Sequence, residues 1–140
     1  MAHNCRALVI HCMDYRFGKA IKQELEDEKL LGDADIVAMA GAAKNLVDPE
    51  MQGFVLKQIE ISKNLHDIKE VYLYNHLDCG AYGGRKAFES DEAERLAIVG
   101  DMEKASEVIK SHWPDLMVHL RLAHIEESPE GNKIWFEKLS

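Results

Sequence analysis

The stretch Arg6-Ala-Leu-Val-Ile-His11-Cys12-Met-Asp14-Tyr-Arg16 joins an apolar run directly to a cluster of polar and reactive side chains. Its first half is continuously apolar and contains β-branched residues, which is typical of a strand buried on both faces of a parallel sheet. The stretch therefore predicts a central strand that ends where the side chains able to do chemistry begin.

Apolar segments alternate with amphipathic segments along the rest of the chain. We expect further strands over residues 34–40, 70–75 and 116–123, and helices over residues 17–29, 49–65 and 91–112, with Pro49 in the first turn of the second helix. The apolar segment 134–136 receives no assignment. The expected core stripes are Met51, Phe54, Val55, Ile59 and Leu65 in the second helix, and Leu96, Val99, Met102, Ala105, Val108 and Ile109 in the third.

This alternation predicts an α/β fold in which a mainly parallel, doubly wound sheet is flanked by helices. We expect a single domain over residues 1–140, because the sequence has neither an internal repeat nor a linker rich in Pro, Gly or Ser. Ligands of such sheets bind beyond the carboxyl ends of the strands, which is where a site is to be sought.

Composition excludes several kinds of partner. The formal net charge is −8 and no run of Lys and Arg occurs, so neither nucleic acid nor an anionic membrane is an expected partner. The apolar stretches fall far short of the roughly 20 residues that span a bilayer. The amino-terminal residues lack the features of a signal peptide, so we expect a cytoplasmic protein. The chain has three cysteines, and so small and odd a number does not indicate a disulfide framework.

Potential metal ligands follow two of the expected strands. Cys12 comes after the first strand, and His76 and Cys79 come after the strand that ends near residue 75. If these strands are neighbours, the three side chains can meet at the carboxyl edge of the sheet. Two thiolates and one imidazole suit zinc, and three protein ligands leave the fourth position of a catalytic zinc to water.

Asp14 and Arg16 lie two and four residues beyond Cys12. Positions two apart share a face in extended chain, so a bidentate pair of Asp14 with Arg16 is expected, which would hold the carboxylate near the metal-bound water. If Arg16 turned away, Asp14 could instead become the fourth ligand and close the site. An ordinary salt bridge at a strand end is the alternative interpretation. Asp78 is expected to be a solvated or capping carboxylate.

The combined pattern is specific. Cys-x-Asp-x-Arg at residues 12–16, followed by His-x-x-Cys-Gly at residues 76–80, resembles the signature of the β-class carbonic anhydrases. The similarity is strongest over residues 7–80.

This resemblance implies a zinc-dependent lyase, a carbonate dehydratase that interconverts carbon dioxide and bicarbonate by means of zinc-bound hydroxide. It implies Zn²⁺ as cofactor, a homodimer or higher homo-oligomer as the assembly, and the following residue roles. The metal ligands would be Cys12, His76 and Cys79, and the dyad that orients the water would be Asp14 and Arg16.

Two departures from the family pattern leave alternatives open. Many members carry Arg-Asn-Ala-Gly-Asn where this chain has Ala38-Met-Ala-Gly-Ala42, and the bulky Tyr15 stands where a small residue is usual. One alternative is hydrolysis of carbonyl sulfide or carbon disulfide at the same zinc, which would release sulfide. The other is a zinc-binding protein without catalytic turnover.

Overall fold

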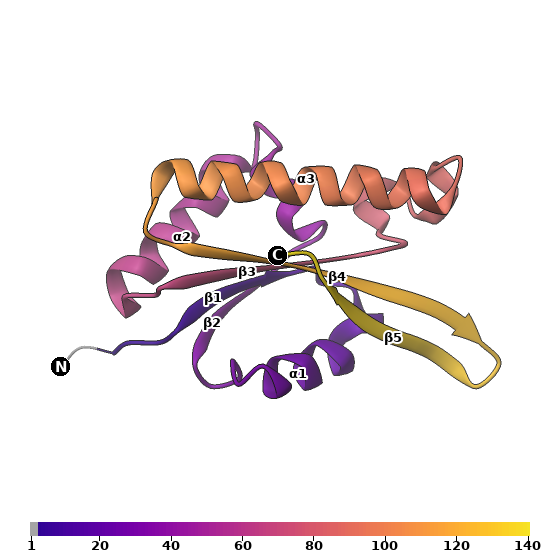
Figure 1. The fold of residues 1–140 in the computed structure, drawn as a ribbon, viewed down its shortest axis with the longest axis horizontal. Coiled ribbons are helices and arrows are strands. Elements are labelled where there is room, and N and C mark those ends of the chain that lie inside the picture. Colours follow the sequence, from indigo (N-terminus) through magenta and orange to yellow (C-terminus); the bar gives the residue numbers. More distant parts are fainter. Residues whose placement is uncertain (1–2) are drawn as a thin grey trace.

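The structure is a computed structural model that describes residues 3–140, and its centre is a five-stranded sheet (Figure 1). The strand order is β2-β1-β3-β4-β5, and only β5 runs antiparallel to its neighbour. The predicted mainly parallel α/β fold is thus confirmed. The strand bounds are β1 Ala7–His11, β2 Ala34–Ala38, β3 Glu70–His76, β4 Met117–Ser128 and β5 Gly131–Lys138.

Three α-helices cover the two faces of the sheet (Figure 1). Helix α1 (Gly18–Asp27) lies on one face, and α2 (Gln52–His66) and α3 (Asp91–His112) lie on the other. The bounds of α3 agree with the prediction, and the Ser90 side chain caps its first turn by accepting the Ala93 N–H. Short 3₁₀ turns complete the chain: η1 Tyr15–Phe17, η2 Ala42–Leu46, η3 Gly80–Tyr82 and η4 Arg85–Ala87.

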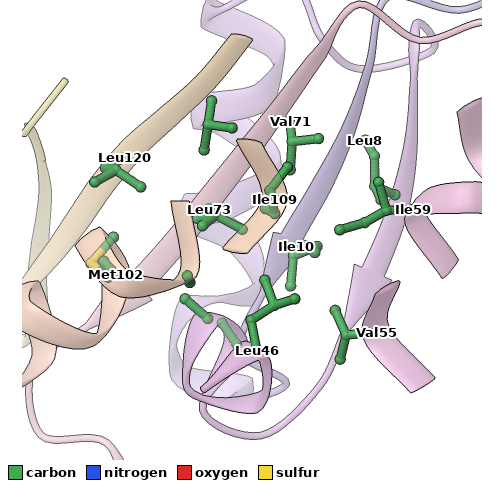
Figure 2. Close-up of a cluster of buried hydrophobic side chains, with 14 of the residues drawn as sticks. Leu8, Ile10, Leu46, Val55, Ile59, Val71, Leu73, Met102, Ile109 and Leu120 are labelled. Atoms are coloured by element: carbon green, nitrogen blue, oxygen red, sulfur yellow. The ribbon is translucent and has the colours of Figure 1, made fainter. Parts of the chain in front are cut away.

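Strand β1 is buried on both faces, as its continuous apolar sequence predicts. Leu8 and Ile10 pack with residues of α2 and α3, whereas Ala7 and Val9 pack with residues of α1. Figure 2 shows the first of these clusters, in which side chains of the sheet interdigitate with those of the helices above it. This packing buries Ala7 to Ile10 and leaves the half-buried His11, the last residue of β1, beside Tyr74 of β3.

Helix α2 differs from the prediction at its start and on its surface. It begins at Gln52 rather than in the turn of Pro49, because the Asp48 carbonyl accepts the N–H groups of Met51 and Gln52 in a preceding turn. Phe54 and Leu65 are exposed and only a narrow stripe faces the sheet, with Val55, Ile59 and Ser62 as its buried members.

Helix α3 buries most of its predicted stripe. Met102, Ala105 and Ile109 are fully buried, and Val99 and Val108 pack partly against the core. Leu96 was predicted to belong to this stripe, but its side chain is 62% exposed. The prediction fails there because the buried side of these first turns is formed by Glu94 and Ile98, and Leu96, two residues from each, lies on the opposite side of the helix. Across residues 3–140, no helix combines the length and the apolar character that crossing a membrane requires.

The carboxyl-terminal part of the chain forms a hairpin that the sequence did not predict. Strand β4 continues to Ser128, and the unassigned segment 134–136 belongs to β5, which pairs with it. A two-residue connection closes the hairpin, with Ser128 opposite Gly131, whose φ of 115° favours glycine.

An ion pair links this hairpin to α3. Glu137 of β5 accepts hydrogen bonds from Arg95 Nη2 at 2.5 Å and from His124 Nε2 at 2.9 Å. The Arg95 contact, followed by the His124 contact, holds the pKa of the Glu137 carboxyl below its ordinary value. Because the folded-state pKa is depressed, this contribution to stability is present above the unfolded-state pKa of glutamate and is lost as the pH falls through the folded-state value.

We expect the unfolding free energy of Glu137→Gln to fall less than that of the wild type when the pH is lowered. Between about pH 6 and about pH 3 the wild type should lose roughly 0.2–1 kcal/mol more unfolding free energy than the variant, the range typical of a partly exposed pair. Urea denaturation at both pH values measures this. Glu130→Gln, which alters an exposed carboxylate in the hairpin connection, serves as the control. Equal acid sensitivity of wild type and Glu137→Gln would contradict the prediction.

Candidate metal centre

The carboxyl ends of β1 and β3 lie side by side. The two strands pair in parallel, with His11 opposite Tyr74, so the chain leaves both strands at the same edge of the sheet. The connections on either side of β1 run to opposite faces, because α1 and α2 cover different faces (Figure 1). This is the switch point at which open α/β sheets form their binding crevices.

Three potential metal ligands converge at this edge. Cys12, His76 and Cys79 each offer one ligand atom, and these atoms all lie within 4.8 Å of one another. All three residues are buried, with exposures of 8%, 3% and 1%. The structure therefore brings together the residues that the sequence placed at two strand ends.

The surroundings of His76 prepare its imidazole to bind a metal. Nδ1 lies 2.7 Å from the Leu77 carbonyl oxygen, which can only accept a hydrogen bond, so Nδ1 carries the proton. The Phe17 ring packs against the imidazole with centroids 4.1 Å apart. Nε2 is buried and has no hydrogen-bond partner within residues 3–140. A buried lone pair without a partner is costly, and a cation beside two thiols would satisfy it.

The surroundings of the Cys12 thiol favour its deprotonated form. The neighbouring Cys79 thiol lowers the pKa of Cys12 despite its burial, and the proximity of His76 and of the Gly41 backbone contributes in the same sense. A thiol that readily gives up its proton is suited to metal binding, because the thiolate is the form that binds metals.

Asp14 and Arg16 form a close bidentate pair beside these ligands. Arg16 Nη2 donates to Asp14 Oδ2 at 2.7 Å, its Nε contacts both carboxylate oxygens at 3.2 Å, and its backbone N–H donates to Oδ1 at 2.9 Å. Asp14 Oδ2 also lies 3.8 Å from His76 Nε2. The Arg16 contacts hold the pKa of the Asp14 carboxyl below its usual value, so it stays ionised at neutral pH.

Asp78 fixes Arg16 from the opposite side. As expected of a capping carboxylate, it accepts the Arg85 N–H through Oδ1 at 2.7 Å. Its Oδ2 also accepts from Arg16 Nη1 at 3.0 Å, and its carbonyl accepts from Nη2 at 2.9 Å. Sequence reasoning missed this second role, because Asp78 reaches Arg16 only through a left-handed backbone conformation with φ of 57°.

A buried glutamate supports the Asp78 loop. Glu94, at the start of α3, is 1% exposed and its Oε2 accepts the Asp78 N–H at 2.7 Å. Its Oε1 lies 3.7 Å from the positively charged Arg85, measured to Nε. No local pattern in the sequence distinguishes Glu94 from the other acidic residues of the first helical turn, so only tertiary contact reveals it.

We expect Glu94→Ala to destabilise the protein by about 1–3 kcal/mol, because it leaves the buried N–H of Asp78 without an acceptor. Glu94→Gln retains an acceptor oxygen and should cost less. Urea denaturation of both variants tests this difference, and equal stabilities of the two variants would contradict the assigned role of the carboxylate.

The altered segment 38–42 is bound to β3 by a buried asparagine. Asn75 Nδ2 donates to the Gly41 carbonyl at 2.9 Å, and its Oδ1 accepts the Ala43 N–H at 3.1 Å. Gly41 has a φ of 80°, and a Cβ there would come within 3.0 Å of the Ala81 Cβ. Glycine is thus required at this position by both backbone conformation and space, although the side chains on either side differ from the usual pattern.

The match to a known family settles the chain's relationship. The family described as "Putative carbonic anhydrase" matches residues 2–128. The chain belongs to this family. The description of this family is consistent with the group of potential metal ligands at the ends of β1 and β3.

Two sequence relatives and one solved structure are similar to this chain. An uncharacterized protein of Rickettsia conorii is 28% identical over 125 residues, covering 85% of this chain and 67% of its own length. An uncharacterized protein of Rickettsia bellii is 29% identical, covering 85% of this chain and 76% of its own. The solved structure of the β-carbonic anhydrase CcaA aligns with a TM-score of 0.54 at 14% identity, over 88% of this chain and 76% of that one. The chain is a divergent member with a β-carbonic-anhydrase-like fold.

Proposed function

We propose that this protein is a zinc enzyme that interconverts carbon dioxide and bicarbonate. Cys12, His76 and Cys79 would hold the metal, and Asp14, fixed by Arg16, would orient the water. The observation that carries the proposal is the buried, unpartnered Nε2 of His76, which faces two buried thiols and lies 3.8 Å from Asp14 Oδ2.

The donor set suits zinc, since two sulfurs and one imidazole nitrogen leave a position free. Zinc bound there supplies a Lewis acid that lowers the pKa of water toward neutrality. The Cys12 thiol needs no distant base, because the adjacent Cys79 thiol, and after it His76, already lower its pKa.

Asp14 would act as a hydrogen-bond acceptor rather than as the final proton acceptor. Its pKa is held low by Arg16, so it stays ionised and presents Oδ2 as an acceptor that keeps the water oxygen's lone pair aimed at carbon. Hydration forms one carbon–oxygen bond and releases one proton, which passes to solvent. Both carboxylate oxygens of Asp14 contact Arg16, and this pairing supports an open site in which Asp14 is not a metal ligand.

The wall beside the ligands is mostly apolar. A small cavity of about 10 Å³ borders Cys12 and His76 and is lined on its other sides mainly by Phe17, Ile21 and Tyr74. This volume holds roughly one water-sized molecule, so the apolar side of the site excludes bulk water from the reacting atoms.

The test is stopped-flow measurement of carbon dioxide hydration by fully zinc-loaded protein over neutral and mildly alkaline pH. We expect hydration well above the buffer rate. Parallel assays with carbonyl sulfide and carbon disulfide, read as sulfide release, distinguish the alternative substrates. Zinc-loaded protein that accelerates none of these reactions would contradict an enzymatic role and favour a non-catalytic zinc protein.

We also propose a homodimer or higher homo-oligomer. Phe54, Ile61 and Leu65 leave apolar side chains exposed along one side of α2, and Ile36 is exposed on the edge strand β2. Exposed apolar groups of this kind are typical of surfaces that become covered on association. Sedimentation equilibrium gives the assembly mass, and a monomer at all concentrations would contradict this part of the proposal.

A further inference from the structure

A second group of metal-ligating side chains lies at a different place in the fold. Cys5 precedes β1, Asp35 lies in β2, and His66 ends α2, yet one ligand atom from each lies within 4.8 Å of the others. The three residues come from segments some thirty residues apart in sequence. Asp35 pairs with Leu8 near the start of β1, so this group lies toward the amino-terminal end of the strand that Cys12 follows at its carboxyl end.

Backbone and side-chain hydrogen bonds hold the group together. The Cys5 N–H donates to the His66 carbonyl at 3.0 Å, which ties the first segment to the end of α2. Asp35 Oδ2 accepts from Ser62 Oγ at 2.6 Å and contacts His66 Nδ1 at 2.7 Å. Ser62 thus acts as a support that orients the carboxylate, as outer partners of metal-binding carboxylates commonly do.

The local charge favours a cation. Besides Asp35, the carboxylate of Asp33 lies close enough to the Cys5 thiol to act on it electrostatically. His66 is the basic side chain paired with Asp35. A metal ion would replace the protons that the thiol and the hydrogen-bonded imidazole now carry, and its charge would offset the nearby carboxylates.

Solvent can reach the group. The side chains of Asp35 and His66 are each 33% exposed. Together with Ser62 and Ile61 they line an open groove of about 240 Å³ between β2 and α2. An ion with one or more water ligands therefore has a route in and out, unlike an ion held by the buried Cys12, His76 and Cys79.

We propose that Cys5, Asp35 and His66 form a second binding site for a divalent metal ion of the zinc type. One sulfur, one imidazole nitrogen and one carboxylate oxygen are a mixed donor set that suits Zn²⁺ and Co²⁺ and leaves a position for water. Because its ligands are partly exposed, this site binds metal more weakly and exchanges it faster than the centre formed by Cys12, His76 and Cys79.

The test is an equilibrium titration of metal-free, reduced full-length protein with Co²⁺, followed by its sulfur-to-cobalt charge-transfer absorption. The wild type should saturate at two ions per chain, and Cys5→Ser should saturate at one, with the weaker phase and its thiolate absorption lost. Asp35→Asn should weaken the same phase. Asp67→Asn removes a carboxylate at the same end of α2 outside the group and should leave both phases intact.

Cys79→Ser separates this inference from the proposed function. That variant should lose the tighter phase and keep the phase that depends on Cys5. Circular dichroism of each variant establishes that it is folded, and Asp35→Asn provides the answer if Cys5→Ser does not fold. A wild type that saturates at one ion, or a Cys5→Ser variant with both phases unchanged, would overturn the second site while leaving the first centre in place.

Discussion

Asp14→Asn should lower the rate of carbon dioxide hydration by about 10²-fold, the order of loss expected when a reacting group is no longer held in position. The amide is nearly the same size as the carboxylate but carries no charge, so it loses both its ion pair with Arg16 and one of its two acceptor oxygens. The zinc content should stay at the wild-type level, because the three proposed ligands are intact. Stopped-flow kinetics and metal analysis on the same sample measure the two quantities.

Arg16 variants sharpen this prediction. Arg16→Lys keeps a positive charge but loses the planar fork that contacts both oxygens of Asp14 and both the carbonyl and carboxylate of Asp78. We therefore expect Arg16→Lys to be impaired, and Asp48→Asn, a carboxylate at an exposed turn, to behave as wild type. A wild-type hydration rate in Asp14→Asn would show that Asp14 has no part in the reaction.

Cys79→Ser should remove zinc from the centre and reduce hydration to the buffer rate. A hydroxyl is a much weaker zinc ligand than a thiolate, and Cys79 is 1% exposed, so water is poorly placed to substitute for it. Loss of an outer partner alone costs about 10–100-fold in metal affinity, so loss of a direct ligand should cost more than about 100-fold.

Metal titration and hydration assays on the same preparation test this second prediction. His76→Asn should produce the same loss, since it removes the nitrogen whose lone pair is otherwise unpartnered. Met13→Leu alters an exposed side chain next to Cys12 and should retain zinc and activity. Tight zinc binding by Cys79→Ser at this centre would rule out the proposed ligand set.

Much of the architecture could be predicted because burial leaves a local imprint on the sequence. The continuous apolar run of β1 indicated burial on both faces, and the repeat in α3 gave its bounds correctly. Predictions failed where the buried stripe of a helix is narrower than its apolar pattern suggests. Leu96 lies two residues from the buried Ile98 and so faces solvent, and Phe54 and Leu65 lie outside the narrow buried stripe of α2. The apolar periodicity of a sequence does not say how wide a stripe the neighbouring layer covers.

The local residue pattern was enough to indicate which side chains could form the metal centre. Cys12, His76 and Cys79 follow apolar strands, and parallel strands of an α/β sheet present their carboxyl ends at one edge, so chemistry and topology together indicated the convergence. The arrangement of the residues around these three side chains depends on contacts between distant segments. Asp78 reaches across 62 positions to Arg16, and Glu94 holds the loop that makes this possible.

The two groups of potential metal ligands differ in how far they can be recognised from the sequence. Cys12 belongs to a motif with close sequence spacing, whereas Cys5 meets Asp35 and His66 only because β2 pairs with β1 and the end of α2 docks beside them. Strand register, helix docking and a left-handed residue set where these side chains point. Those features depend on contacts between distant segments, which no local pattern of residues records.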